Sequence, residues 1–311
     1  MLTEAQNLAV VRTELDRVFK QNFDYDDTTP SIATANTAAL FKPMTIDRQA
    51  YIEEIYKGGG LFPKIGEVGQ VPVSDIKVAN KLITPVLDFA DSRELSKNWF
   101  DDQLHNLWQH TVADMAMKAR ITQDVNAFGI YRGAFATTLT ADGGYLVGTH
   151  TLLNGQSYSN LVTGALSPTT LNDAIVALRQ QPDQAGVVLG NAPAYLLVPS
   201  KLFKHAIEIT QSALIADVAN NNVNVYRSIY GLTVYSSPYL DYIAGFTSDG
   251  SDTAWFLLSK NHTVTRMVRQ GLQTFLRDWG YSNNRTYNYQ ANFRETVYSP
   301  DYIGVVGSLG T

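Results

Sequence analysis

The stretch DGGYLVGTH, residues 142–150, combines three glycines with a histidine, residue types that occur in phosphate-binding loops and at metal or proton-transfer sites. The stretch does not match GxGxxG and lacks the GK[ST] ending of a phosphate loop. It is followed by the polar segment TLLNGQSYSN, where a phosphate loop would run into a helix. We therefore interpret residues 142–150 as a turn built from glycines, which tolerate the backbone angles of tight turns.

Other candidate motifs are also incomplete. His105 and His110 lie five residues apart, whereas a zinc-binding helix places two histidines four residues apart with a glutamate after the first. The segment GQSYSN (155–160) lacks the second glycine of a GxSxG nucleophile elbow. The segment DYDDTTP (24–30) lacks the glycine and the closing glutamate of a calcium loop. The sequence therefore predicts no catalytic residue, no metal site and no cofactor.

Composition favours a protein that makes extensive protein contacts. The 311 residues are 45% hydrophobic and only 17% charged, and they include 17 tyrosines. Tyrosine is enriched and charge depleted at the centres of protein interfaces. The net charge of −5 speaks against a basic nucleic-acid reader, and the absence of cysteine excludes disulfides. We expect no signal peptide, no membrane helix and no membrane partner.

The N-terminal third alternates between regular and irregular patterns. Apolar residues at helical spacing predict a helix over the first 20 residues, and the polar segment 22–43 predicts an extended arm. We expect a short helix over 45–57, ended by three glycines. Alternating residues in 67–89 predict a two-stranded ribbon that is polar on both faces. Such a ribbon is marginally stable alone and needs a partner surface.

A long helix is predicted over residues 95–128. Its apolar stripe comprises Phe100, Leu104, Trp108, Val112, Met115 and Ala119. Gly129 is expected to close the helix. A helix of roughly 30 residues spans about 45 Å. Because no heptad is sustained, we expect a spine that lies across a sheet rather than a coiled coil.

The second half predicts an α/β region followed by strands only. Ser167 caps a helix that begins at Pro168, and Pro182 follows its end. Strands are expected at 194–199, 231–240 and 254–259, with a helix from 202. After 262 the pattern is all β: residues 285–293 alternate, and 302–307 form the last strand.

This order of parts resembles the major capsid proteins of tailed bacteriophages, which have the Hong Kong 97 (Johnson) fold. Residues 143–160 look similar to a segment of Mu-like head subunits, and residues 195–209 look similar to the strand and helix that open the second half of the axial domain. The resemblance implies an α+β fold with an N-arm, an extended β-ribbon loop, a peripheral domain with a long spine helix, and an α/β axial domain.

The resemblance also implies domain bounds. Residues 1–60 would form the N-terminal helix and arm, 61–92 the ribbon loop, 93–150 with 261–311 the peripheral domain, and 151–260 the axial domain. His150 and its glycines would then be a structural turn where the chain leaves the peripheral domain.

The implied function is structural and not enzymatic. Copies of the chain would form pentamers and hexamers that close an icosahedral head around double-stranded DNA, with loose and non-specific DNA contact. Portal and scaffold proteins are the other expected partners, with decoration proteins as a further candidate. The protein would assemble in the host cytoplasm and reside in the virion. Lys81 lies in the ribbon, but nothing in the sequence transfers to it the covalent crosslinking of some relatives.

Charged residues in and near the ribbon, together with three C-terminal arginines, are the candidate assembly contacts. They are Glu67, Asp75, Lys77, Lys81, Arg93, Glu94, Arg266, Arg269 and Arg277. Three alternatives stay open at this point: an encapsulin-type cellular compartment with the same fold, a small-molecule enzyme or binding protein that uses the α/β region, and a tail or decoration protein.

Overall fold

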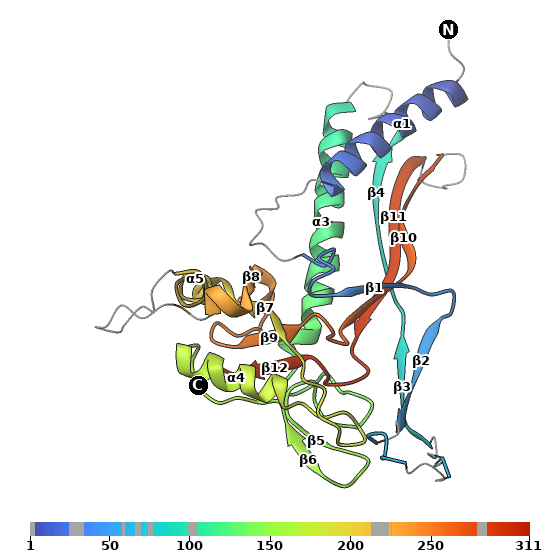
Figure 1. Ribbon diagram of the computed structural model, residues 1–311. Coiled ribbons are helices and arrows are strands. Elements are labelled where there is room, and N and C mark those ends of the chain that lie inside the picture. Colours follow the sequence, from blue (N-terminus) through green and yellow to red (C-terminus); the bar gives the residue numbers. More distant parts are fainter. Residues whose placement is uncertain are drawn as a thin grey trace.

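The computed structural model describes residues 4–24, 34–57, 60–65, 70–71, 73, 77–98, 105–212, 224, 226–278 and 285–311. The helices are α1 (Glu4–Phe23), α3 (His105–Arg132), α4 (Pro168–Arg179) and α5 (Phe203–Gln211), with short turns η1 (Ser200–Leu202), η2 (Tyr226–Tyr230) and η3 (Pro238–Leu240). The strands are β1 (Lys42–Thr45), β2 (Ala50–Lys57), β3 (Lys77–Pro85), β4 (Leu87–Ser96), β5 (Thr149–Thr151), β6 (Ser157–Ser159), β7 (Pro193–Val198), β8 (Thr233–Ser236), β9 (Trp255–Ser259), β10 (Thr265–Arg277), β11 (Thr286–Tyr298) and β12 (Val305–Ser308). The fold is α+β, as predicted (Figure 1).

A long sheet with the strand order β1-β10-β11-β4 lies beside the spine helix α3. The alternation predicted for residues 285–293 is confirmed, because Tyr287, Tyr289, Ala291 and Phe293 are all buried. Three of these pack with Trp108, Val112 and Met115 of α3 in one apolar cluster, to which α1 adds Leu15 and Phe19. The long sheet thus shares a core with the part of α3 from Trp108 to Ala116, whereas Phe128 and Tyr131 at the end of the helix pack in a separate cluster with Phe256.

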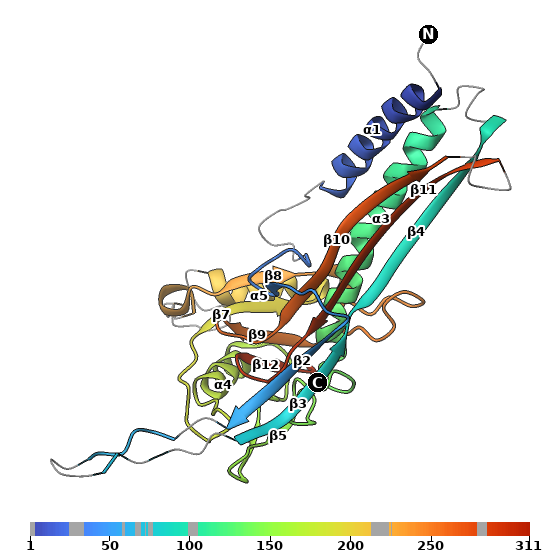
Figure 2. The same cartoon turned by 90° about the vertical axis from the view of Figure 1, so that its right-hand side faces the viewer.

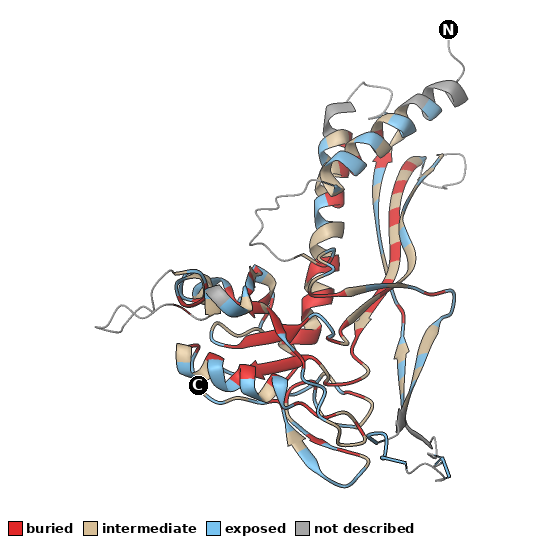
Figure 3. Cartoon of the chain, in the orientation of Figure 1, coloured by how far each residue is buried: buried red, intermediate tan, exposed pale blue. Residues whose placement is uncertain are grey.

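A second sheet, β12-β9-β7-β8, forms the α/β region together with α4 and α5. Helix α4 begins as predicted: the Ser167 side chain accepts a hydrogen bond from the Thr170 backbone N–H, and Pro168 is the first helical residue. Strand β9 is buried along its whole length. Figure 3 shows this sheet as the most continuously buried part of the chain.

The segment expected to be a short helix over 45–57 contains strands instead. Residues 50–57 form β2, which pairs with β3 in an antiparallel ribbon. Tyr51 and Ile55 are of the aromatic and β-branched types that favour strands, and pairing with β3 supplies the partner that a strand requires. The first strand of the ribbon therefore precedes 61, and β4 continues directly from its second strand.

The long helix is displaced from its predicted bounds. Leu95 and Ser96 belong to β4, and the structure describes α3 from His105 onward; Phe100 and Leu104 lie outside the described residues. The helix also continues past Gly129, because Phe128 and Tyr131 are buried in the core at its end. Gly133 follows the last helical residue, and a Cβ there would collide with the Thr137 hydroxyl.

The ribbon and the long sheet extend in opposite directions from β1 (Figures 1 and 2). Tyr298 of β11 anchors the base of the ribbon, where its hydroxyl donates to Glu53 at 2.8 Å and its ring lies 5.5 Å from that of Tyr51. Beyond this anchor the ribbon projects from the body of the protein. In the described part of the chain, no helix is both long and apolar enough to cross a membrane.

Candidate functional site

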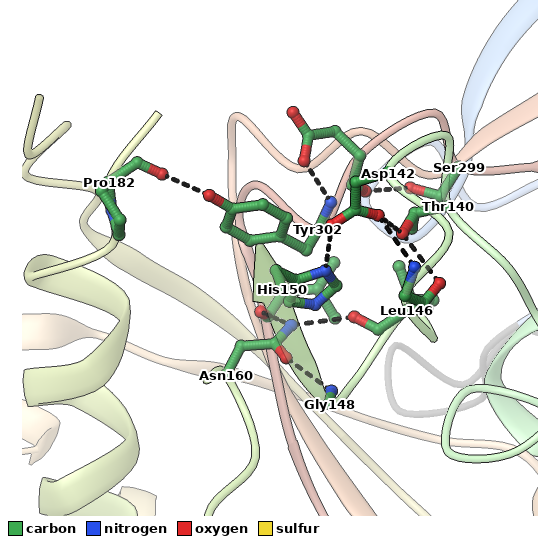
Figure 4. Close-up of polar contacts among 12 residues, drawn as sticks. Thr140, Asp142, Leu146, Gly148, His150, Asn160, Pro182, Ser299 and Tyr302 are labelled. Atoms are coloured by element: carbon green, nitrogen blue, oxygen red, sulfur yellow. Dashed lines mark hydrogen bonds and ion pairs between the residues drawn. The ribbon is translucent and has the colours of Figure 1, made fainter. Parts of the chain in front are cut away.

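His150 occupies the centre of a buried polar cluster beside the α/β region (Figure 4). The antiparallel pair β5–β6 positions it, and its side chain is 0% exposed. The Nδ1 atom lies 2.8 Å from Asp142 Oδ2, and the Tyr302 ring stacks on the imidazole with ring centroids 4.1 Å apart. The stretch 142–150, which was considered above as a possible reactive site, therefore does contain an aspartate–histidine pair.

The surrounding turn holds Asp142 as a carboxylate. The Thr140 hydroxyl and the Gly144 backbone N–H both donate to Asp142 Oδ1. Burial acts to raise the pKa of Asp142, but the hydrogen bonds from His150 and Thr140 outweigh it and hold that pKa below its usual value. Gly144 fits this packing because a Cβ at that position would lie 3.0 Å from His150 Nδ1.

Two further residues, Asn160 and Tyr302, join the cluster to distant segments. The Asn160 amide donates to the carbonyls of Leu146 and Val305 and accepts from the Gly148 backbone N–H. The Tyr302 hydroxyl donates to the Pro182 carbonyl at 2.9 Å. Burial raises the pKa of the neighbouring Asp301 to about 6. The cluster therefore joins the turn after α3, the α/β region and the C-terminal strand.

An aspartate–histidine pair can act as a general base only if a nucleophile, which is a hydroxyl, a thiol or a water molecule, reaches the other imidazole nitrogen. His150 Nε2 has no hydrogen-bond partner among the described residues, and the Asp142 side chain is only 2% exposed. A substrate cannot reach either group. The geometry agrees with the structural turn expected from the sequence, and the described residues hold no group of three or more candidate metal ligands.

A second polar cluster, which sequence reasoning missed, fixes the arm segment, residues 34–41, to the body. Asp124 Oδ1 accepts from the Ala35 backbone N–H at 2.7 Å, and burial raises the Asp124 pKa to about 6. The Arg266 guanidinium donates to the Asn36 side chain and pairs with Glu295. The Ala35–Asp124 and Asn36–Arg266 contacts join residues 89 and 230 positions apart, so no local pattern could have revealed them.

Two more hydrogen bonds fix the arm segment to the body. The Tyr131 hydroxyl donates to the Leu40 carbonyl at 2.9 Å, and His262 Nε2 lies 3.0 Å from the Ala39 carbonyl. Burial lowers the pKa of His262 to about 4, so the imidazole is neutral at pH 7 and donates through Nε2–H. Leu40 and Phe41 are buried in the main core cluster.

The predicted assembly residues divide into three groups. Glu67 and Asp75 lie outside the described residues, and of Lys77 only its backbone position at the start of β3 is described. Lys81 is exposed and lies directly opposite Glu54 in the ribbon.

The second group belongs to β4 and makes contacts within the chain. Arg93 pairs with Asp91 at 3.0 Å and approaches Asp114 of α3. Glu94 accepts a hydrogen bond from Asn288 at 3.1 Å. These contacts are made at the surface, so both residues stay candidates for contact with a neighbour.

The three arginines of β10 form the last group. Arg266 pairs with Glu295, and its side chain is only 12% exposed, so little of it is free for a neighbouring subunit. Arg277 is exposed and Arg269 is half-buried, and both stay predictions as contact residues. The structure brings none of these arginines to the described part of the ribbon within one chain.

Exposed apolar side chains gather on the ribbon and at its end. Ile52 of β2 and Ile83 of β3 lie directly opposite each other and are 48% and 59% exposed. Between the two strands, Leu61 and Phe62 are 81% and 102% exposed. Exposed apolar patches of this kind mark surfaces that bind another protein.

Comparisons with known proteins agree on one fold and one family. A family model described as a phage capsid protein matches residues 89–307. The mature capsid of bacteriophage PhiM1 is similar with a TM-score of 0.57 at 13% identity, covering 92% of this chain and 89% of that chain. The capsid of the cyanophage P-SCSP1u gives 0.56 at 11% identity, with 92% and 90% covered.

A virus-like particle from Pyrococcus furiosus is similar too, with a TM-score of 0.53 at 11% identity, covering 95% of this chain and 98% of that chain. No curated protein matches the chain. At such identities the structural likeness shows the fold, and the family model adds the family.

Proposed function

We propose how this protein builds a shell. The premise is that the chain belongs to the phage capsid protein family and is a structural protein rather than an enzyme. Copies of the chain associate as pentamers and hexamers, and these close an icosahedral head around double-stranded DNA. The observation that carries the proposal is the ribbon, which projects from the body and has exposed apolar side chains.

The exposed face of the ribbon suits contact with another subunit. Ile52 and Ile83 form an apolar pair, and the next pair on the same face is Glu54 and Lys81. Full burial of one isoleucine contributes roughly 1.5–3 kcal/mol, and these two are already half covered, so contact with a neighbour would gain part of that. The ribbon lies over a neighbouring subunit of the same ring.

The remaining parts have roles that follow the family architecture. The α/β region, about 150–260, points to the ring axis. The spine helix α3 and the C-terminal strands make contacts between rings. A large self-complementary surface closed by symmetry is what a shell requires, and the low content of charge suits such surfaces.

Other partners follow from this role. Portal and scaffold proteins would meet the shell during assembly in the host cytoplasm, and decoration proteins would meet its outer face. The net charge of −5 fits loose contact with packaged DNA, because tight binding needs many lysines and arginines that neutralise phosphates. The finished protein would reside in the virion.

A second candidate function is a closed cellular compartment that holds a protein cargo and no DNA. The observation in its favour is the similarity to the Pyrococcus furiosus particle over nearly the whole of both chains. The match to the phage capsid family favours the virus head.

The test is negative-stain electron microscopy of the purified protein, with mass photometry of the same sample. Closed shells, or rings of five and six copies, would support the proposal. Double-stranded DNA recovered from native particles would separate the virus head from the compartment. A uniform monomer under all assembly conditions would overturn both.

A further inference from the structure

The arm segment, residues 34–41, is held at two points by side chains that can change their charge. Asp124 of α3 accepts a hydrogen bond from the Ala35 backbone N–H, and His262, in the loop before β10, donates to the Ala39 carbonyl. Both side chains belong to residues that are buried, with exposed fractions of 5% and 1%. Docking of this one short segment therefore covers two ionisable groups at once.

The surroundings of His262 suit only the neutral imidazole. Its Nε2–H is the donor to Ala39, and its Nδ1 atom is buried without a hydrogen-bond partner in the described part of the chain. A proton on Nδ1 would be a buried donor that finds no acceptor, which costs free energy. Burial, together with the positive charge of Lys42 on β1, lowers the pKa of His262 from 6.5 to about 4, although the contact with Ala39 acts in the other direction.

The surroundings of Asp124 favour the protonated carboxyl group. The Ala35 N–H and the guanidinium groups of Arg120 on α3 and Arg266 on β10 all favour the carboxylate. Burial outweighs the three of them and raises the pKa of Asp124 from 3.8 to about 6. Tyr239 of η3 also faces Asp124, and burial raises the pKa of the tyrosine hydroxyl, so this group stays neutral.

A second carboxyl group lies in the same buried region. Glu295 of β11 is 1% exposed, and its Oε1 atom has no hydrogen-bond partner among the residues that the structure describes. Burial, and in addition the negative charge of Asp124, raises the pKa of Glu295, although its ion pair with Arg266 opposes this. Because two buried carboxyl groups disfavour each other's ionisation, the region keeps a proton in mild acid. The hydrogen bonds described for Glu295 go to Arg266, so docking of the arm segment acts more directly on Asp124.

We propose that the arm segment docks with little net change in protonation, because Asp124 takes up a proton as the segment docks while His262 releases one. The contribution of Asp124 to docking is complete below pH 3.8 and is lost as the pH rises through about 6. The contribution of His262 is complete above pH 6.5 and is lost as the pH falls through about 4. The two changes have opposite signs over nearly the same interval and therefore cancel.

This proton exchange takes place within one chain and does not depend on shell formation. Either ionisable contact alone would make the arm segment a pH switch, whereas the two together keep it closed to the same extent in mild acid and at neutral pH. The other contacts of the segment do not titrate in this range. They are the hydrogen bond from the Tyr131 hydroxyl to the Leu40 carbonyl and the buried side chains of Leu40 and Phe41.

Hydrogen exchange of the unassembled full-length protein, read by mass spectrometry on peptides that cover residues 34–41, tests the exchange of protons. The measured rate divided by the rate of unprotected amides at the same pH gives the fraction of time for which the segment is open. Between about pH 6.5 and about pH 4.5, we expect this fraction to change by less than about threefold in the parent, because the two titrations cancel.

Two single variants should each turn the segment into a pH switch, with opposite directions. Asp124→Asn keeps an oxygen that accepts from Ala35, and only His262 then titrates, so the open fraction should rise roughly twentyfold or more as the pH falls from about 6.5 to about 4.5. His262→Gln keeps a donor for Ala39, and the open fraction should fall roughly twentyfold over the same interval. In the double variant the pH dependence should disappear again.

An exposed aspartate of the same helix provides the matched control. Asp114 pairs with Lys118 at the surface, and Asp114→Asn should leave the open fraction as independent of pH as in the parent. The proposal is overturned if the open fraction of the parent itself changes tenfold or more. It is also overturned if the single variants open the segment equally at all pH values, which is the result expected from loss of packing alone.

A titration of the histidines by NMR spectroscopy gives a second readout. The protein has five histidines, and the signal of His262 is the one that disappears in His262→Gln. We expect this signal to stay unchanged between about pH 7 and about pH 5, since the buried imidazole remains neutral there. A midpoint near the ordinary value for histidine, about 6.5, would show that His262 releases no proton on docking and would overturn the proposal.

Discussion

Arg266 and Glu295 form a buried ion pair on neighbouring strands β10 and β11, with 2.5 Å between guanidinium and carboxylate and a Glu295 side chain that is only 1% exposed. The same guanidinium donates to Asn36 of the arm segment. One charged side chain thus links the sheet to the arm, and removal of it would disturb both.

We predict that Arg266→Met destabilises the unassembled protein strongly. The change leaves the Glu295 carboxylate buried without its partner, which costs about 3–5 kcal/mol. Urea denaturation followed by circular dichroism measures the loss. The double variant Arg266→Met/Glu295→Leu should regain most of it, and a single variant as stable as the parent would contradict the role of the pair.

Asp124 makes stability depend on pH in a defined direction. Burial raises the pKa of Asp124 from 3.8 to about 6 in the folded state. Between pH 3.8 and about 6, the folded protein therefore keeps a proton on this carboxyl group that the unfolded chain has released. The contribution of Asp124 to stability is therefore greatest below pH 4, falls as the pH rises to about 6, and is constant above. Desolvation of the charged carboxylate causes this fall.

Asp124→Asn should remove this pH dependence and keep an oxygen that accepts from Ala35. We expect the variant to match the parent near pH 4 and to be more stable at pH 7, by on the order of 2 kcal/mol. Thermal unfolding at both pH values measures the difference. Because Asp301 also has a raised pKa, the variant should keep part of the pH dependence of the parent.

Two nearby glycines should respond very differently to alanine. A Cβ on Gly144 would lie 3.0 Å from His150 Nδ1 and 3.2 Å from the Thr149 carbonyl, whereas a Cβ on Gly148 meets nothing closer than 3.8 Å. We predict that Gly144→Ala destabilises the protein by about 1–3 kcal/mol through overpacking. Gly148→Ala is the matched control and should change the unfolding free energy little; equal losses would refute the packing argument.

Local sequence patterns were sufficient to predict the elements that depend on interactions between residues close in the sequence. The cap at Ser167, the alternation along β11 and the helical stripe of α1 were all visible, because each depends on residues within a few positions. Strand β2 was mistaken for a helix because its partner β3 begins 20 residues after it ends. The end of α3 was misplaced because packing of Tyr131 outweighs the preference of Gly129.

The candidate site was less accessible to prediction. His150 was singled out, but its contacts with Asp142 and Tyr302 depend on a turn and on the segment before β12, which is more than 150 residues away. The contacts that fix the arm segment to the body were missed entirely, because Ala35 and Asp124 are brought together only by the tertiary fold. The charged residues predicted for assembly stay predictions, because contacts between subunits involve a second chain.

The ribbon face offers a test that separates assembly from folding. In the variant Ile52→Thr/Ile83→Thr, both strands keep β-branched residues, and the two side chains are already about half exposed. The unfolding free energy of the unassembled protein should therefore change by less than about 0.5 kcal/mol per substitution. Each contact with a neighbour loses apolar area, and a loss of about 1.4 kcal/mol raises the protein concentration needed for assembly tenfold.

The control is Val188→Thr/Leu189→Thr, because these residues are exposed to a similar extent but lie between α4 and β7, outside the ribbon. Light scattering at a series of protein concentrations measures the threshold for shell formation of each variant. If the ribbon lies over a neighbour, only the ribbon variant raises the threshold. If both variants assemble like the parent, this face of the ribbon does not contact another subunit.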